Sequence, residues 1–493
     1  MHIALLNPQG NFDPLDSRWT EHPDFGGQLV YVKEIAVSLA ALGHQVDILT
    51  RQILDPEWTE FQAPYDSYPE VKGVRIVRIP CGPEQFLPKE HLWQYLGTEW
   101  VPNILNFFQK EGSVPEVFSA HYGDGGLSAV LLSQQTNTPI TFTGHSLGAQ
   151  KIDKLLVSNE NLSDLDRQHG FSLRISAERV AMNHADRIIT STYQERIQQY
   201  GHSAYAGAVD VRATETFEVI PPGVNLEVFS EKEGKLDLVI EERIKAYLQK
   251  DILPERRKLP VALASSRLDA KKNLTGLVRA FGMSQTLQSK SNLALVVRGV
   301  ENPFQNAVSL SSTEQAIMDE ITALIEEYSL QGKITAFPLN SQQELAAAYR
   351  RLSQRLSVFV LPALYEPFGL APLEAMSCGL PAVVTRHGGP SESLEEGGRV
   401  FAKLVDPEDP AELAGGILSL VESKTLWQRY RDAGRERVLE KYTWQATARG
   451  YERVFEAIVV AGHQPGELPI PSWYTDPLEE NKPGIKDLQA IYF

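Results

Sequence analysis

The sequence predicts an α/β protein built from two doubly wound domains, each with a mainly parallel sheet. Short runs of β-branched residues alternate with longer amphipathic stretches, a pattern typical of parallel α/β construction. The alternation stops at Pro221-Pro222-Gly223, passes through a charged, irregular segment and restarts near Pro260. A chain of 493 residues also exceeds the size at which one hydrophobic core usually stops growing. Two such domains imply a deep cleft between them, bounded by the loops at the carboxyl ends of the strands.

The amino-terminal half predicts strands on either side of an early amphipathic helix. The helix is expected from about Gln28 to Leu42, because apolar residues recur on one face and Gly43 provides a stop. The strands are expected at Ile3–Leu6, Val46–Thr50, Val74–Ile79, Val117–His121, Ile140–Thr143, Ile188–Ser191 and Phe217–Ile220.

The carboxyl-terminal half repeats the pattern and then ends in a helix and a Pro-rich tail. We expect one domain over residues 1–225, a second over 226–454, and a tail from about 455 to 493 that packs back on the first domain. The last long helix is expected from about Thr443 to Val460. The strands of the second domain are expected at Val261–Ala264, Leu293–Val297, Ile334–Ala336, Val358–Leu361 and Ala382–Thr385.

Composition excludes several classes of protein. A hydrophobic fraction of 42% and a charged fraction of 22% describe an ordinary globular chain, and a net charge of −16 argues against nucleic acid or an anionic membrane as partner. The two cysteines, Cys81 and Cys378, have no ligand-like spacing, so neither a disulfide framework nor a zinc site is expected. The start of the chain has no basic leader. These features predict a soluble, cytoplasmic protein.

Three motifs point to a site for an anionic ligand. Gly26 and Gly27 in DFGGQ precede the first helix, whose free N–H groups and dipole favour anions. Arg267 and Lys272 in SRLDAKKN follow the first strand of the second domain and could neutralise a leaving diphosphate. An ordinary glycine turn and a solvated basic loop are the alternatives for these two motifs.

The third motif, YEPFGLAPLEAMSCGLPAVVT, is the strongest signal. Glu366 lies before a helix and Glu374 within its first turns, so the two carboxylates could address different parts of one long ligand. The backbone N–H groups of Phe368–Ala371 head the same helix and could bind hydroxyl or phosphate oxygens. Acidic capping is the alternative, but it does not account for the aromatic-glycine loop between the two acids.

Together these motifs resemble those of retaining, nucleotide-sugar-dependent glycosyltransferases of the GT-B fold, which have two Rossmann-like domains. The resemblance covers essentially the whole chain. The strings NPQGNFDP, TEHPDFGGQLVYV, HYGDGG and TGHSLGAQK narrow it to the sucrose-phosphate synthases and the related sucrose synthases. It implies transfer of glucose from UDP-glucose to fructose 6-phosphate, giving sucrose 6-phosphate and UDP. Transfer to free fructose, or another nucleotide-sugar transfer on the same fold, is the alternative.

The resemblance also implies roles for individual residues. Glu374 is expected to bind the ribose hydroxyls and Glu366 the glucose, while Arg267 and Lys272 stabilise the departing β-phosphate and His145 donates a hydrogen bond to the donor sugar. The implied catalytic residues are His145, Arg267, Lys272 and Glu366, and the implied donor-binding residues are Gly27, Arg267, Lys272, Glu366, Phe368, Gly369, Leu370 and Glu374.

An acceptor with a phosphate group needs Arg or Lys at a fixed place. By resemblance, Lys151 and Arg174 form the phosphate pocket, with Lys89 as a further contact; simple surface charges are the alternative. The full implied acceptor set is Gly26, Gly27, Gln28, Lys89, Tyr122, Lys151 and Arg174.

No cofactor is expected, because UDP-glucose is a co-substrate. No metal is expected to be required either, because cationic side chains can replace it and the sequence shows no D-x-D-like pair; a divalent ion would stimulate at most. Neither the oligomeric state nor the strictness toward the nucleobase follows from the sequence.

Two other classes of protein compete with the transferase interpretation. Gly144-His145-Ser146-Leu147-Gly148 matches the G-x-S-x-G elbow of hydrolases, but His387, the most suitable downstream histidine, falls in the other predicted domain. A non-catalytic sugar-sensing protein would be expected to lack one of Arg267, Lys272 and Glu366, and all three are present.

Overall fold

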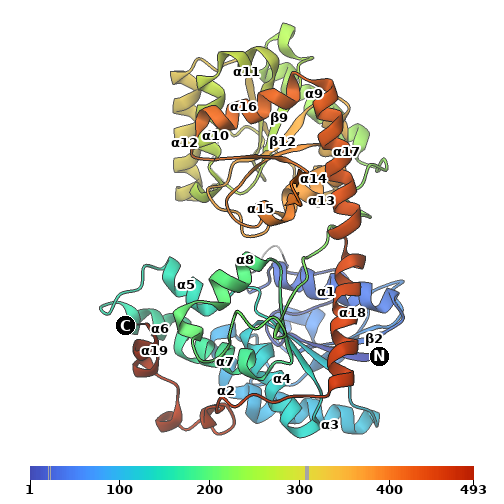
Figure 1. Cartoon of the computed structure of the whole chain (residues 1–493), viewed down its shortest axis with the longest axis vertical. Coiled ribbons are helices and arrows are strands. Elements are labelled where there is room, and N and C mark those ends of the chain that lie inside the picture. Colours follow the sequence, from blue (N-terminus) through green and yellow to red (C-terminus); the bar gives the residue numbers. More distant parts are fainter. Residues whose placement is uncertain (20–21, 23, 306–309, 493) are drawn as a thin grey trace. The chain divides into compact units, whose positions relative to one another are not determined.

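The computed structural model describes residues 1–19, 22, 24–305 and 310–492 and divides the chain into two units (Figure 1). Unit 1 comprises Met1–Pro221 and Trp444–Phe493, and unit 2 comprises Pro222–Thr443. Part of the string TEHPDFGGQLVYV, namely residues 20, 21 and 23, lies outside the described residues. Within the described part of the chain, no helix is long and apolar enough to cross a membrane.

Unit 1 contains an eight-stranded sheet in the order β3-β4-β2-β1-β5-β6-β7-β8. Every neighbouring pair is parallel except the edge pair of β3 with β4. The strands expected from the sequence are confirmed to within one or two residues at their ends, and β3 was not predicted. The strands are β1 His2–Leu6, β2 Gln45–Arg51, β3 Tyr65–Asp66, β4 Val74–Ile79, β5 Val117–His121, β6 Ile140–Thr143, β7 Arg187–Thr190 and β8 Phe217–Val219.

The two faces of this sheet support separate hydrophobic cores, because successive side chains of a strand point to opposite faces. In β1, Ile3 and Leu5 join one core, while Ala4 and Leu6 join the other. Burial on both faces explains why the strands are nearly continuous apolar runs. The unit 1 helices are α1 Gly27–Ala41, α2 Trp93–Tyr95, α3 Val101–Glu111, α4 Tyr122–Thr136, α5 Gly148–Lys154, α6 Leu162–His169, α7 Phe171–His184, α8 Tyr193–Glu195, α18 Trp444–Ala461 and α19 Ile485–Tyr492.

Unit 2 repeats this construction with a fully parallel six-stranded sheet in the order β11-β10-β9-β12-β13-β16. A small antiparallel hairpin, β14–β15, stands apart from it. The strands of unit 2 are β9 Val261–Ser265, β10 Asn292–Val296, β11 Ile334–Phe337, β12 Val358–Leu361, β13 Ala382–Thr385, β14 Glu395–Glu396, β15 Arg399–Val400 and β16 Lys403–Val405. Its helices are α9 Asp237–Asp251, α10 Leu274–Met283, α11 Gln285–Lys290, α12 Ser312–Glu327, α13 Gln342–Ser353, α14 Leu370–Ser377, α15 Pro390–Ser393, α16 Pro410–Val421 and α17 Lys424–Lys441.

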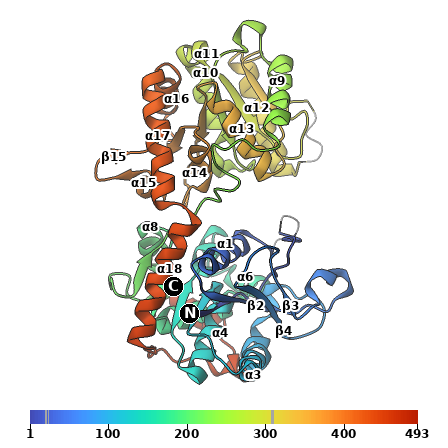
Figure 2. The same cartoon turned by 90° about the vertical axis from the view of Figure 1, so that its right-hand side faces the viewer.

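The second boundary between the units differs from the one expected. It lies between Thr443 and Trp444, not at 454/455. The reason is packing: α18 runs alongside α1 (Figure 2), and its Trp444 and Tyr451 are buried in the same core as Ile3 and Leu5. The whole of α18 therefore belongs to unit 1.

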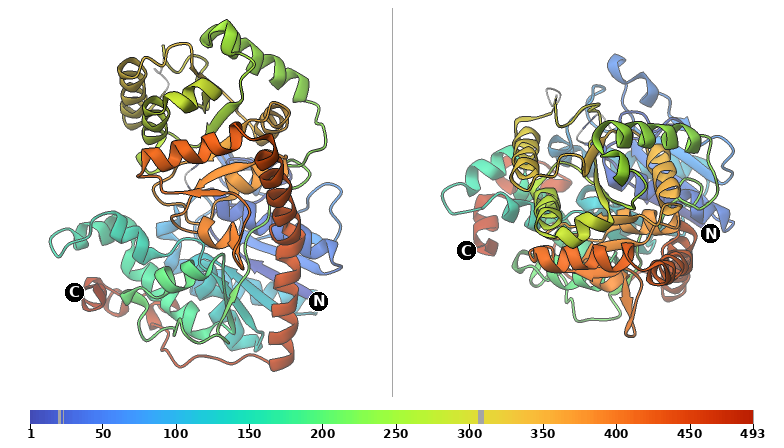
Figure 3. Two further views of the ribbon diagram at one scale, coloured as in Figure 1. Left: turned by 45° about the horizontal axis from the view of Figure 1, so that its top comes forward. Right: turned by 90° about the horizontal axis from the view of Figure 1, so that it is seen from above.

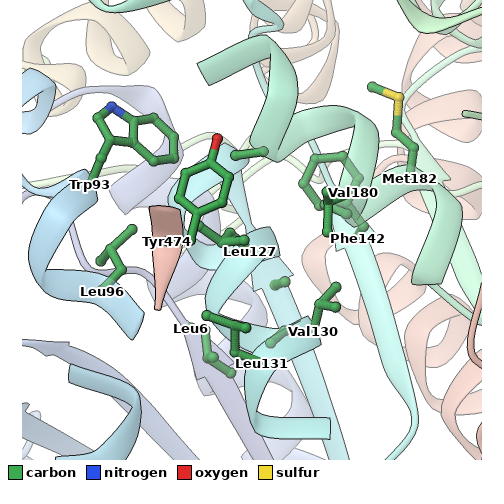
Figure 4. Close-up of a cluster of buried hydrophobic side chains, with 14 of the residues drawn as sticks. Leu6, Trp93, Leu96, Leu127, Val130, Leu131, Phe142, Val180, Met182 and Tyr474 are labelled. Atoms are coloured by element: carbon green, nitrogen blue, oxygen red, sulfur yellow. The ribbon is translucent and has the colours of Figure 1, made fainter. Parts of the chain in front are cut away.

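The tail that follows α18 packs on unit 1. Tyr474 is buried beside Leu127 and Leu131 of α4 (Figure 4), and its hydroxyl donates to the carbonyl of Leu173 at 2.6 Å. Further on, α19 lies against α6 and α7 (Figure 3), where Leu488 is buried. Buried side chains such as Tyr474 and Leu488 thus hold the Pro-rich tail on unit 1, although the tail has little regular secondary structure.

Candidate active site

In unit 2, the loop after β9 carries the two predicted cations. Lys272 lies in a 3-10 turn, Ala270–Lys272, which Asp269 caps by accepting from the backbone N–H of Lys271 at 2.9 Å. The Lys272 Nζ donates to Glu366 Oε2 at 2.7 Å, across 94 positions of sequence. Arg267 is exposed, and its guanidinium hydrogen-bonds no other residue within the described ranges. The structure thus joins Lys272 and Glu366 and leaves Arg267 available to a ligand.

The predicted aromatic-glycine loop ends at the start of α14. Gly369 has a φ of +94° and forms the N-cap of the helix, and among the residues that the structure describes no side chain hydrogen-bonds this N-terminus. Such a φ favours glycine, because other residues are strained in the left-handed region. The ring of Phe368 packs edge-on against Tyr442 at a centroid distance of 6.0 Å. The leading N–H groups of α14 are therefore presented by a loop of fixed shape.

Two glycines that sequence reasoning missed hold this loop in place. The Glu366 N–H donates to the carbonyl of His387 at 3.1 Å, and the Gly389 N–H donates to the carbonyl of Glu366 at 2.9 Å. A Cβ at Gly388 would lie 2.1 Å from the Glu366 carbonyl oxygen, and one at Gly389 would lie 2.4 Å from that of Pro367. Only glycine fits at either position. The signal in the sequence is the glycine pair that directly follows His387.

Glu374 is only partly exposed and lies within α14, as predicted. Burial raises the pKa of its carboxyl to about 7. Close to neutral pH the side chain therefore exists in both protonation states. Hydrogen bonds donated by a ligand's hydroxyl groups would favour the charged form.

In unit 1, the predicted basic residues Arg174 and Lys89 lie close enough to Lys151 for their charges to act on it. Burial, followed by the positive charges of Arg174 and Lys89, lowers the pKa of the Lys151 ammonium. Lys89 Nζ also pairs with Asp24 Oδ1 at 2.7 Å, so part of its charge is already compensated. A cluster of cations that destabilise one another is relieved by an anion, and a phosphate group carries the charge that this requires.

Arg174 differs from the expectation of a simple phosphate contact, because it is also a structural anchor. It is 4% exposed, its Nε donates to Glu178 Oε1 at 2.9 Å, and an Nη donates to the carbonyl of Ser146. Glu178 also accepts from the Gly148 N–H at 3.0 and 2.9 Å and from the Tyr205 hydroxyl at 2.5 Å. The buried ion pair therefore fixes the loop between β6 and α5.

Removing this anchor should cost stability. We expect Arg174→Ala to lower the free energy of unfolding by about 3–5 kcal/mol, because it leaves the buried Glu178 carboxylate without its cation. Arg167→Ala is the control, since its pair with Asp164 is 75% exposed on both sides and should contribute less than about 1 kcal/mol. Urea denaturation of both variants measures this, and equal midpoints for the two would contradict the anchoring role.

Tyr122 completes this part of unit 1. It begins α4 with a φ of +68°, and the guanidinium of Arg174 stacks over its ring at 4.4 Å. The left-handed backbone is unusual for an aromatic residue and is often found at functional sites. The structure thus brings Tyr122 together with Arg174, one of the basic residues that the resemblance groups with it.

The glycine turn before α1 is open. Gly26 is the N-cap, and a Cβ at Gly26 or Gly27 would meet nothing within 4 Å. Within the described parts of the chain no side chain caps this helix end, and Gln28 Nε2 donates to Asn7 Oδ1 at 3.3 Å. Packing within the protein therefore does not require these glycines, whereas a closely approaching ligand would.

His145 follows β6 in a left-handed conformation with a φ of +57°. Its Nε2 hydrogen-bonds Nδ1 of His121 at 3.0 Å, and burial lowers its pKa to about 4, so the ring is neutral at pH 7. Within the described part of the chain, no hydrogen bond joins the Ser146 hydroxyl to a histidine. The hydrolase interpretation therefore has no base in place.

Comparisons with known proteins show the family of the chain. The family model for glycosyl transferases group 1 matches residues 248–437, and that for a glycosyl transferase 4-like domain matches residues 26–211. A probable sucrose-phosphate synthase from Thermosipho melanesiensis is 40% identical over 92% of this chain and 96% of its own. A probable sucrose-phosphate synthase from Solanum tuberosum is 32% identical over 92% of this chain, which spans only 47% of that longer protein.

Solved structures of similar proteins have the same fold as this chain. The sucrose-phosphate synthase from Thermosynechococcus elongatus has a TM-score of 0.62 and 25% identity, over 94% of this chain and 100% of its own. The catalytic domain of starch synthase IV from Arabidopsis thaliana has a TM-score of 0.60 at 13% identity, over 93% of this chain and 99% of its own, and supports the fold alone. The chain has the GT-B fold, is a glycosyltransferase, and belongs to the sucrose-phosphate synthase family.

Proposed function

We propose that the protein transfers glucose from UDP-glucose to fructose 6-phosphate, with retention of configuration, and releases sucrose 6-phosphate and UDP. The observation that carries the proposal is the basic cluster of unit 1, in which burial and then the positive charges of Arg174 and Lys89 lower the pKa of the Lys151 ammonium. A phosphate ester relieves this repulsion, whereas free fructose brings no charge to it. The names of the Thermosipho and Thermosynechococcus relatives support the same assignment.

Unit 2 is proposed to hold the donor. Arg267 and Lys272 would meet the β-phosphate, and the leading N–H groups of α14 with Glu366 would hold the glucose. The free guanidinium of Arg267 and the ion pair of Lys272 with Glu366 support this, because the pair puts one charge for the phosphate beside one acceptor for the sugar. Fixed cations aimed at developing negative charge stabilise a transition state.

The proposed chemistry needs no protein nucleophile. The bond between glucose C1 and the β-phosphate oxygen breaks, and the acceptor's anomeric hydroxyl oxygen attacks C1 from the same face. The proton of that hydroxyl passes to the departing phosphate oxygen, so UDP leaves with the charge balanced. We propose that no metal or cofactor is required, because Arg267 and Lys272 supply the positive charge.

An activity matrix tests this function. UDP release is measured with UDP-, ADP- and GDP-glucose against fructose 6-phosphate and fructose, with and without a chelator, and the sugar product is identified by mass spectrometry. We expect the highest kcat/KM with UDP-glucose and fructose 6-phosphate, a product of the mass of sucrose phosphate, and no effect of the chelator. Equal or greater activity with free fructose would favour a sucrose synthase instead.

The raised pKa of Glu374 predicts a pH dependence of donor use. Below about pH 7 this carboxyl is mainly protonated and accepts hydrogen bonds from ribose hydroxyls poorly. We therefore expect kcat/KM for UDP-glucose to rise from about pH 6 to about pH 8 in the native enzyme. Glu374→Gln, which does not titrate, serves as the control and should show a flatter profile, so parallel profiles would contradict a role for this ionisation.

A further inference from the structure

Two histidines of unit 1, His145 and His121, form a pair. The resemblance implies a role for His145 but none for His121. His121 ends β5 and His145 follows β6, and these strands are parallel neighbours. The rings stack with centroids 5.2 Å apart and planes inclined by 27°, and one hydrogen bond of 3.0 Å joins Nδ1 of His121 to Nε2 of His145. Since both atoms can donate or accept, this bond contains one proton, which belongs to one ring or the other.

The surroundings of His121 decide which ring carries that proton. Burial holds the pKa of both rings below the ordinary value, so each ring is neutral and has a single N–H. The other nitrogen of His121, Nε2, is buried and has no partner among the described residues. Buried N–H groups without an acceptor are rarer than buried acceptors without a donor. The favoured arrangement has the proton on Nδ1 of His121, donated to Nε2 of His145.

The remaining contacts of His145 are consistent with this direction. The ring of Tyr31 packs edge-on against it at 5.0 Å, but the Tyr31 hydroxyl is engaged with the hydroxyl of Tyr451 at 3.0 Å. Within the described ranges, Nδ1 of His145 has no hydrogen-bond partner. The left-handed backbone, the stacked His121 and the edge of Tyr31 thus fix the ring and leave one nitrogen for a ligand.

We propose that His121 is a positioning residue, which holds neutral His145 in the tautomer with its proton on Nδ1 and so makes that atom a hydrogen-bond donor to a hydroxyl of the donor sugar. The sugar contact rests on the proposed function; the tautomer does not. Without His121, the proton of His145 would move to Nε2, the nitrogen that an unconstrained imidazole favours, and Nδ1 would become an acceptor. The wrong tautomer of a histidine costs activity without loss of the fold.

Nitrogen NMR of the free enzyme tests the tautomer directly. Protein with 15N-labelled histidine is compared with His145→Gln, whose missing signals assign the ring. We expect Nδ1 of His145 to resonate as a protonated nitrogen and Nε2 as an unprotonated one at pH 7, and the two to exchange character in His121→Phe. A native spectrum with the proton on Nε2 would overturn the proposal, even if no variant folds.

Kinetics distinguish positioning from mere structural support. We expect His121→Phe to lower kcat by about tenfold with little change in the KM for fructose 6-phosphate, and His121→Asn, whose amide can still donate, to recover most of the loss. His184→Phe is the matched control, because His184 is a buried histidine of the same unit that bonds the carbonyl of Leu468; it should leave the His145 signals unchanged. Equal losses in the Phe and Asn variants would contradict the donor role. If NMR shows the expected tautomer but no variant changes kcat, His145 does not bind the donor sugar. The position of the proton on Nδ1 would still be confirmed.

Discussion

Lys272→Ala is expected to lower kcat by about a hundredfold to a thousandfold while changing the KM for the acceptor little. The ammonium group is hydrogen-bonded to Glu366 at 2.7 Å, and in the proposed mechanism this fixed position would let it stabilise the charge on the departing phosphate without further reorganisation. Removing the ammonium group raises the free energy of the transition state more than that of the ground state. Both kcat and kcat/KM therefore fall. Arg267→Ala should have an effect of similar size. Steady-state assay of UDP release measures both.

Lys271→Ala is the matched control for these variants. Lys271 is exposed in the same turn. Its N–H donates to Asp269 Oδ1 at 2.9 Å and its carbonyl accepts from the Leu364 N–H at 2.9 Å, and alanine retains both of these backbone groups. Its turnover should stay within about twofold of the native value, since exposed charges contribute little. Near-native kcat in Lys272→Ala and Arg267→Ala would remove both residues from the mechanism.

Lys151→Ala is expected to raise the KM for fructose 6-phosphate by about tenfold to a hundredfold, because it removes a charge-assisted contact to the phosphate. The KM for free fructose should not change, so the preference between the two acceptors should narrow. Lys151 gives a cleaner test than Arg174, whose buried pair with Glu178 also supports the loop. The measurement is the ratio of kcat/KM for the two acceptors.

Lys154→Ala provides the comparison, since Lys154 is an exposed cation on the same short helix, α5. This variant changes the net charge by the same amount as Lys151→Ala, but Lys154 is not part of the basic cluster. Its preference for fructose 6-phosphate over fructose should therefore equal that of the native enzyme. If Lys151→Ala leaves the ratio unchanged, or if Lys154→Ala lowers it equally, the phosphate does not bind at Lys151.

The strands were predictable because burial on both faces of a parallel sheet demands nearly continuous apolar runs, and these stand out in the sequence. The elements that were missed lack this requirement. β3 has only two residues, Tyr65–Asp66, at an exposed edge, and β16 is the edge strand Lys403–Val405 of the other sheet. The extent of α18 in unit 1 depends on contacts with α1, which a local pattern does not encode.

In the candidate site, too, local sequence patterns indicate some residues and omit others. Motifs with a characteristic spacing indicated Lys272, Glu366 and Glu374 as candidates, and the structure adds a hydrogen bond between the first two that the motifs did not predict. What local patterns omit is the support from distant segments, such as the contact of Gly388 with Glu366 and that of Glu178 in α7 with the backbone N–H of Gly148 in α5. Each of these is recognisable only when two strand ends or two helices lie together in space.

A crystal structure of the enzyme with UDP and fructose 6-phosphate bound would locate both phosphates directly. We expect the UDP β-phosphate within hydrogen-bonding distance of Arg267 and Lys272, and the acceptor phosphate in contact with Lys151. A β-phosphate that contacts neither cation, or an acceptor phosphate bound away from the basic cluster of unit 1, would contradict this expectation.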